Sequence, residues 1–136
     1  MTDFLDQVAA TGLGELAETM GIEITEASAQ RLVGRMPVAG NRQPFGLLHG
    51  GASVVLAESL GSIAAALHGG PEKAPVGIEI SATHHRSATS GHVTGTATAI
   101  SLGRTLATYE IVIVDDEDRR ICTARLTCLL RDRPSG

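Results

Sequence analysis

The sequence predicts an α+β fold in which one long apolar helix packs on an antiparallel β-sheet. Three observations support this prediction. A long, mostly apolar segment of helical composition occupies the middle of the chain, from about residue 51 to residue 67. Four segments rich in β-branched residues follow it and are separated by turn-forming residues. We find neither a repeat nor a long linker in the 136 residues, so we expect a single domain, residues 1–136.

The first third of the chain is expected to contain one helix and two short strands. Residues from about Asp3 to Met20 have helical composition, with interruptions at two glycines. Short strands are expected at about Ile22–Thr25 and Arg31–Pro37. The following loop, Val38–Leu48, contains two glycines and a proline, which disfavour regular structure.

The central helix is predicted from about Gly51 to Leu67, because the His-Gly-Gly-Pro sequence that follows is a strong termination signal. The turns after it, centred on residues 90–91, 102–104 and 115–118, are those of an antiparallel meander. The four predicted strands are Val76–His85, His92–Ser101, Thr105–Val114 and Arg120–Leu130.

The composition argues against several classes of protein. The net charge is −4 and aromatic residues make up only 2%, so the basic, aromatic-rich surface of a nucleic-acid-binding protein is not expected. The first residues include Asp3 and Asp6 rather than the basic start of a signal peptide. No uninterrupted apolar run reaches the roughly 18 residues of a membrane span. We therefore expect neither a nucleic acid nor a membrane as a partner.

The two cysteines are expected to be free thiols. Cys122 and Cys128 lie six residues apart in one predicted strand, which separates them by about 20 Å. Cysteines that far apart cannot form a disulfide bond. Unbridged cysteines are typical of a reducing compartment, so we expect a cytoplasmic protein.

A lone carboxylate, Glu58, lies in the middle of the apolar helix, within the sequence QPFGLLHGGASVVLAESLG. Burying a carboxylate is costly unless it is paired, hydrogen-bonded or facing a cavity. One interpretation is that Glu58 and Ser62, one turn later, form a narrow solvent-exposed stripe. The other is that Glu58 lines a cleft, with Ser62 beside it.

Residues just before the helix favour the cleft. Gly50 and Gly51 fall at its start, where backbone N–H groups lack intrahelical partners and suit an oxyanion that develops on a carbonyl. His49 could orient this loop or be merely structural, and Gln43 supplies a neutral amide. A carboxylate, an N–H pair and an amide together are similar to acyl-transfer machinery that lacks a Ser or Cys nucleophile.

The sequence QPFGLLHGGASVVLAESLGS resembles the signature of hotdog-fold acyl-CoA thioesterases. The resemblance continues through VGIEISATHHR, SLGRT and YEIVIVDDEDRRICTARLT, and so covers most of the chain after about Gly21. It is strongest to the PaaI-like subgroup, which contains Arthrobacter-type 4-hydroxybenzoyl-CoA thioesterases and the 1,4-dihydroxy-2-naphthoyl-CoA thioesterases of menaquinone biosynthesis. The resemblance implies the hotdog fold, a long helix wrapped by a curved antiparallel sheet. It also implies a homodimer with active sites at the subunit interface, and often a homotetramer.

The resemblance further implies roles for individual residues. Glu58 matches the catalytic carboxylate, and Gly50 matches the residue whose N–H polarises the thioester carbonyl. Gln43 and His49 match supporting positions in the loop, and Ser62 matches a Ser or Thr near the carboxylate. Gln43 and Gly50 would face Glu58 of the partner subunit. Positions that match substrate or CoA contacts are Gly77, His84, His85, Arg86, Ser87 (often Pro in close relatives), Ser101, Leu102, Gly103, Arg104 (the cation of its turn), Thr105 and Leu106.

The expected function is hydrolysis of an acyl-CoA thioester, with an aromatic acyl group of the hydroxybenzoyl or dihydroxynaphthoyl type. Glu58 would act as a general base toward water or as a nucleophile, and both roles stay open. The alternatives are a medium-chain acyl-CoA thioesterase and a non-hydrolytic acyl-CoA-binding or dehydratase-type hotdog protein. No cofactor is expected, since CoA is part of the substrate. No metal is expected either, because His84 and His85 would point to opposite faces of a strand.

Overall fold

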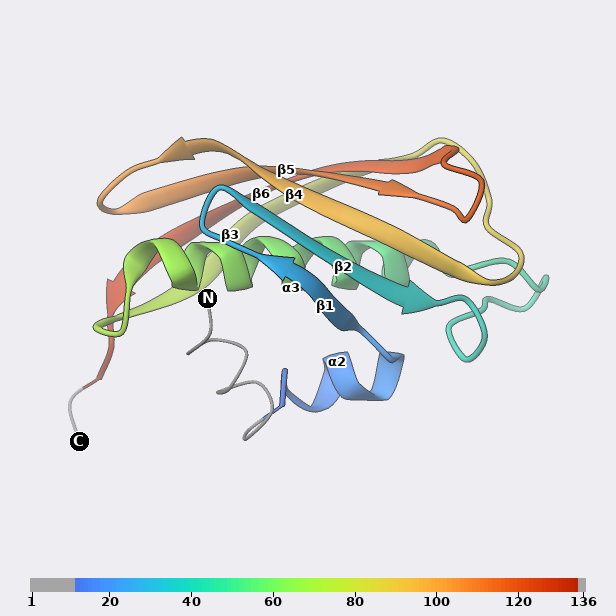
Figure 1. The fold of residues 1–136 in the computed structure, drawn as a ribbon, viewed down its shortest axis with the longest axis horizontal. Coiled ribbons are helices and arrows are strands. Elements are labelled where there is room, and N and C mark those ends of the chain that lie inside the picture. The colour runs from blue at the N-terminus through green and yellow to red at the C-terminus, as the bar shows by residue number, and fades with distance from the viewer. Residues whose placement is uncertain (1–11, 135–136) are drawn as a thin grey trace.

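The computed structural model of the protein describes residues 12–134. A curved antiparallel sheet wraps around one long helix, as predicted (Figure 1). The part of the predicted N-terminal helix from Asp3 to residue 11 lies outside the described residues. The elements are α2 (Glu15–Met20), β1 (Glu23–Ala27), β2 (Arg31–Pro37), α3 (Gly50–Gly69), β3 (Lys73–His84), β4 (His92–Leu102), β5 (Leu106–Val114) and β6 (Arg120–Asp132).

The strand order is β1-β2-β4-β5-β6-β3, which corrects the predicted meander. Strands β4, β5 and β6 are neighbours in chain order, but β3 pairs with β6 at the far edge, and β2 takes the place beside β4. The predicted turn at Ser90-Gly91 therefore belongs to a connection that crosses from one edge of the sheet toward the middle. Hydrogen bonds from Leu48 N–H to the Ala88 carbonyl and from Val38 N–H to the Gly91 carbonyl, both 2.9 Å, hold this connection against the loop before α3.

Helix α3 packs close to the sheet because glycines of the sheet face Leu60 in the middle of the helix. Leu60 is fully buried, and a Cβ at Gly34 in β2 or Gly95 in β4 would lie 2.6 or 2.7 Å from a Leu60 methyl group. Gly61 is packed in the same way against Leu126 of β6. Small residues at these contacts let an almost aromatic-free core reach close packing.

The opposite face of α3 is only half covered within one chain. Although the helix is mostly apolar, Val54, Val55 and Ile63 remain half-exposed. By length and composition, α3 would pass as a membrane span, with 20 residues and a mean hydropathy of 1.5. The apolar run is nevertheless interrupted by Glu58 and by three serines. The apolarity of α3 has a structural explanation in its contact with the concave face of the sheet (Figure 1).

Strand β3 forms an edge of the sheet along all 12 of its residues. Most of its residues are exposed or half-exposed, including Ile78, whose side chain is 58% exposed. A β-bulge between Gly77 and Glu79 shifts its pairing with β6. A long edge with free backbone groups is a site where a further strand can add.

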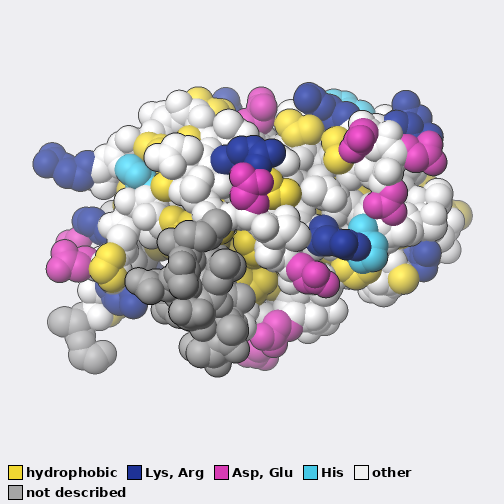
Figure 2. Space-filling view, viewed as in Figure 1, with side chains coloured by type: hydrophobic (Ala, Val, Ile, Leu, Met, Phe, Trp, Pro, Cys, Tyr) yellow, Lys and Arg dark blue, Asp and Glu magenta, His cyan; other side chains and the backbone are white. Residues whose placement is uncertain are grey.

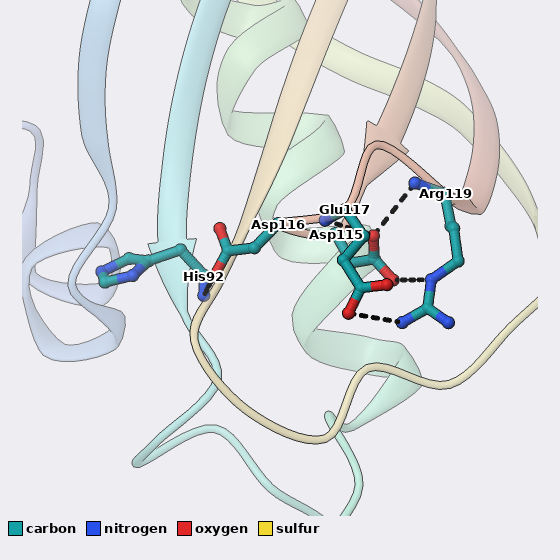
Figure 3. Close-up of polar contacts among 5 residues, drawn as sticks. All are labelled: His92, Asp115, Asp116, Glu117 and Arg119. Atoms are coloured by element: carbon teal, nitrogen blue, oxygen red, sulfur yellow. Dashed lines mark hydrogen bonds and ion pairs between the residues drawn. The ribbon is translucent and has the colours of Figure 1, made fainter.

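Asp115 fixes the turn between β5 and β6 (Figure 3). Its carboxylate accepts hydrogen bonds of 2.9 Å from the backbone N–H groups of Arg119 and Glu117 and from Arg119 Nε. These bonds, that of the Arg119 N–H above all, hold the pKa of Asp115 below its ordinary value. Asp116 accepts a 3.1 Å hydrogen bond from the His92 N–H at the start of β4. The acidic turn is thus tied to its own hairpin and to the neighbouring strand.

Acidic and basic side chains are interspersed on the face shown in Figure 2. This distribution accords with a chain whose 15 acidic and 11 basic residues nearly balance. Paired charges account for part of it. Glu26 forms an ion pair with Arg31, and Lys73 pairs with Asp132 at 2.7 Å.

Raising the pH should destabilise the protein through Tyr109, which is fully buried and donates a 2.6 Å hydrogen bond to the Ala29 carbonyl. Burial, with a smaller effect of Cys128, raises its pKa from 10.0 to about 12. The folded state therefore holds this proton more tightly than the unfolded chain, and up to about 3 kcal/mol of unfolding free energy should be lost between pH 10 and pH 12. Urea unfolding as a function of pH measures this loss. Tyr109→Phe should show a shallower decline, and parallel curves would contradict the assignment.

Candidate active site

His49 determines how α3 begins. Its backbone is extended, and its Nδ1 accepts a 2.8 Å hydrogen bond from the Gly51 N–H, which makes it the N-cap. The expectation that Gly50 and Gly51 offer two free N–H groups is therefore wrong for Gly51. Within residues 12–134, no hydrogen-bond partner is found for the Gly50 N–H. One donor at the helix N-terminus remains available to a ligand.

Gln43 shapes the loop that precedes the helix. Its side-chain Oε1 accepts hydrogen bonds from the backbone N–H groups of Phe45 and Leu47. Its backbone N–H donates a 2.8 Å hydrogen bond to the Leu47 carbonyl. With Oε1 used inside the loop, the side-chain NH₂ is the group that can point outward as a donor.

A cavity of about 280 Å³ lies at the N-terminal end of α3 and collects many of the residues suggested by sequence. The side chain of His84 lies against the start of the helix, so that a Cβ at Gly50 would be 3.1 Å from His84 Nε2. Glycine at position 50 therefore allows this close approach. The sequence-derived residues that line the cavity are Gln43, Gly50, His84, His85, Arg86 and Ser87.

Glu58 lies on the wall of a second cavity, of about 270 Å³, between α3 and the N-terminal segment. The side chain is half-buried, and Ser62 lines the same cavity one turn later. The remaining lining is largely apolar and includes Leu13, Ala17 and Ile63. Sequence reasoning missed Leu13 and Ala17, because they approach Glu58 only through the packing of α2 on α3. A carboxylate beside an apolar cavity is an arrangement in which a base or nucleophile can meet an acyl group.

Cys128 lies beneath this carboxylate and was not connected with it from the sequence. The residue is buried in β6, and burial raises the pKa of its thiol. A hydrogen bond from Ser62 opposes this rise, and the nearby charge of Glu58 adds to it. Cys128 and Cys122 are both free, as expected.

The residues around Arg104 lie at the other end of α3. The turn between β4 and β5, which contains the suggested positions 101–106, approaches the helix C-terminus through a 2.7 Å hydrogen bond between His68 Nε2 and the Gly103 carbonyl. A third cavity, of about 330 Å³, is lined by Leu102, Gly103 and Arg104 together with Lys73.

The cavity at Gly50, the cavity at Glu58 and the turn that contains Arg104 lie at different points along α3 of one chain. Eight residues separate Gly50 from Glu58, and eighteen separate Gly50 from His68, which corresponds to about 12 Å and 27 Å. One chain thus does not bring Gln43 and Gly50, Glu58, and the Arg104 turn to a common point.

The two adjacent histidines have different neighbours, although both line the cavity at the N-terminal end of α3. His84 packs near Gly50, whereas His85 Nε2 lies 2.9 Å from Thr123 Oγ1. Among residues 12–134, no group of three or more His, Cys, Asp or Glu side chains is arranged to hold a metal ion.

Comparison with known families decides the class of this site. Residues 45–122, more than half of the chain, match the family model described as Thioesterase superfamily. The chain belongs to the thioesterase superfamily. The matched region contains the helix N-terminus, Glu58 and strands β3 to β5. This thioesterase has the hotdog fold and is a thioester hydrolase of the acyl-CoA type.

Individual relatives cover nearly the whole thioesterase. A protein of Cronobacter turicensis named proofreading thioesterase EntH is 48% identical over 124 residues, which is 90% of each chain. The crystal structure of a Gln-to-Ala variant of a thioesterase from Pseudomonas aeruginosa is 41% identical, with a TM-score of 0.88 over 95% of this chain and 94% of that one. A Gln-to-Ala variant of a thioesterase from Staphylococcus aureus is 35% identical, with a TM-score of 0.83 over 85% of this chain and 98% of that one.

Proposed function

We propose that this thioesterase hydrolyses an aromatic acyl-CoA, of the hydroxybenzoyl or dihydroxynaphthoyl type, to the free acid and CoA. The observation that carries the proposal is the position of Glu58, a half-buried carboxylate on the wall of a small cavity whose other lining is apolar side chains and two serines. A cavity of about 270 Å³ lined by Leu13, Ala17 and Ile63 suits a compact ring better than a long flexible chain.

Hydrolysis of a thioester needs a hydrogen-bond donor that polarises the carbonyl group. It also needs a nucleophile, either a water molecule or a carboxylate, that attacks the carbonyl carbon. The Gly50 N–H, at the positive end of the α3 dipole, would donate to the oxyanion that forms on the thioester carbonyl. The NH₂ of Gln43 would support the same carbonyl. Glu58 would deprotonate a water molecule or attack directly to give an anhydride, and the CoA thiolate would leave in either case. Single turnover in oxygen-18 water distinguishes these routes, because only the anhydride route places the label in the enzyme carboxylate.

We further propose that the working site forms between two subunits. Gly50 and Glu58 lie too far apart in one chain to act on one carbonyl, and β3 offers a 12-residue free edge. Antiparallel pairing of two β3 edges about a twofold axis would bring Gln43 and Gly50 of one subunit to the Glu58 cavity of the other. A homodimer is therefore the smallest active unit in this proposal, and two such dimers could form a tetramer.

The S. aureus relative has a Gln and a Glu with the same spacing as Gln43 and Glu58. Crystal structures of that protein carry replacements of a Gln and of a Glu that are fifteen residues apart in its chain. Gln43 and Glu58 are fifteen residues apart here. We propose that these two positions correspond.

A panel of CoA esters tests the substrate assignment. Benzoyl-, hydroxybenzoyl- and dihydroxynaphthoyl-CoA should give higher kcat/KM than hexanoyl- to decanoyl-CoA, with released CoA detected by a thiol-reactive dye. Preference for the aliphatic esters would favour the medium-chain alternative. Absence of hydrolysis together with tight binding would favour a non-hydrolytic acyl-CoA-binding protein.

Arg104→Ala should raise KM for CoA esters by about 3–10-fold and change kcat less, because a charge that holds the nucleotide end acts equally in the ground state and transition state. Steady-state kinetics with one good ester measures the effect. The matched control is Arg31→Ala, since Arg31 is an exposed arginine on β2 that forms an ion pair with Glu26 of β1. An unchanged KM in the Arg104 variant would assign Arg104 to the solvated turn alone.

A further inference from the structure

Gly77 lies directly beside the carboxylate of Glu58. A Cβ at this position would be 2.7 Å from Glu58 Oε2 and 3.6 Å from its Cδ. A contact of 2.7 Å is shorter than a carbon atom and a carboxylate oxygen tolerate. The carboxylate can therefore occupy its present position beside β3 only while residue 77 has no side chain, and a Cβ there would displace it.

We propose that Gly77 is a positioning residue that sets where the Glu58 carboxylate lies, an inference that rests on the proposed function of Glu58. Gly77 pairs with Cys128 of β6, so both residues project toward the helix side of the sheet. Cys128 is close enough to Ser62 and Glu58 to interact with both. Gly77, Cys128 and Ser62 together therefore confine the carboxylate, with Gly77 as the boundary on the β3 side.

The β-bulge reinforces this boundary. The register of β3 against β6 shifts between Gly77 and Glu79, which leaves Ile78 as an extra residue. Bulges bend a strand and change the direction of side chains next to active sites. Here the bulge begins directly after Gly77, so the strand changes direction next to the residue that lies beside the Glu58 carboxylate.

The glycine is not required by backbone conformation. The φ angle of Gly77 lies outside the left-handed region in which an L-residue is strained. The other neighbour of a Cβ here is a Leu126 methyl group at 3.4 Å, an ordinary contact. Alanine should therefore fit the strand, and its main conflict should be with Glu58 Oε2.

The test is a double-mutant cycle between Gly77→Ala and Glu58→Asp, because aspartate withdraws the carboxylate by one methylene group. In the wild-type background, Gly77→Ala should lower kcat about 10–100-fold with little change in KM, since a displaced catalytic group loses its alignment. In the Glu58→Asp background, the same change should lower kcat less than about twofold. The pH profile of kcat should shift in Gly77→Ala and not in the double variant. Ser81→Ala, on the outer face of the same strand, is the control and should match the wild type.

Each result decides the inference. Equal losses of kcat in both backgrounds, or a higher KM with unchanged kcat, would overturn it and make Gly77 a substrate contact. If Gly77→Ala lowers the melting temperature, Glu58→Asp should restore it, and failure to do so would place the conflict at Leu126 instead. If Glu58→Gln retains full turnover, the proposed function itself fails. If Glu58→Gln is slow and Gly77→Ala is not, only the positioning role is wrong.

Discussion

Replacement of Glu58 with Gln should lower kcat about 10²–10⁴-fold while substrate binding persists. Glutamine keeps the size and much of the hydrogen bonding of the side chain but cannot act as a base or a nucleophile, and this range is usual for loss of a positioned acid–base group. Thioester hydrolysis measured with a thiol-reactive dye gives kcat, and binding of a non-hydrolysable CoA analogue gives the affinity.

The stability of this variant helps to separate the two interpretations of Glu58. Removal of a partly buried charge without a full partner should leave the melting temperature unchanged or raise it. Glu110→Gln, at an exposed glutamate on β5, is the matched control and should keep full activity. Near-wild-type turnover of Glu58→Gln would mean that Glu58 and Ser62 form a polar stripe on the helix rather than a catalytic site.

Mixed dimers of two slow variants should regain about half of the wild-type turnover. In a dimer of one Glu58→Gln chain and one Gln43→Ala chain, one site combines both changes and the other combines none, if the site forms between subunits. Co-expression with two different affinity tags and sequential purification isolates these dimers. Their kcat per dimer, compared with that of each parent, measures the recovery.

The control for this experiment is a mixed dimer of two Glu58→Gln chains with the same two tags, which should stay slow. Turnover of the Glu58/Gln43 mixture that equals the mean of its parents would place both residues of a site in one chain. That result would contradict the intersubunit site and leave the role of Glu58 to the single variant.

Features set by neighbouring residues could be predicted from the sequence. The limits of α3 follow from its apolar run and the His-Gly-Gly-Pro sequence after it, and Glu58 is conspicuous there as the one charged side chain. The strands are within a few residues of their predicted positions, because β-branched composition and turn residues are local signals.

Features set by long-range packing could not be predicted in the same way. Nothing local indicates that β3 crosses to pair with β6, since a strand carries the same alternation beside either neighbour. The approach of Leu13 and Ala17 to Glu58 depends on α2 packing across α3. The hydrogen bond to His49 makes the Gly51 N–H unavailable to a ligand. The sequence places His49 beside two glycines but does not indicate which backbone N–H its side chain will accept from.

The exposed edge of β3 also affects the tendency of this protein to aggregate at high protein concentration. Within the described residues, β3 is a 12-residue edge strand with an exposed isoleucine, and such an edge can pair with any extended chain, including a misfolded one. Pairing with an identical subunit would remove that edge from competition. If subunits pair through β3 as proposed, substitutions that weaken the pairing should yield precipitate more readily than soluble single chains. Selection against aggregation would then preserve this strand even where turnover is dispensable.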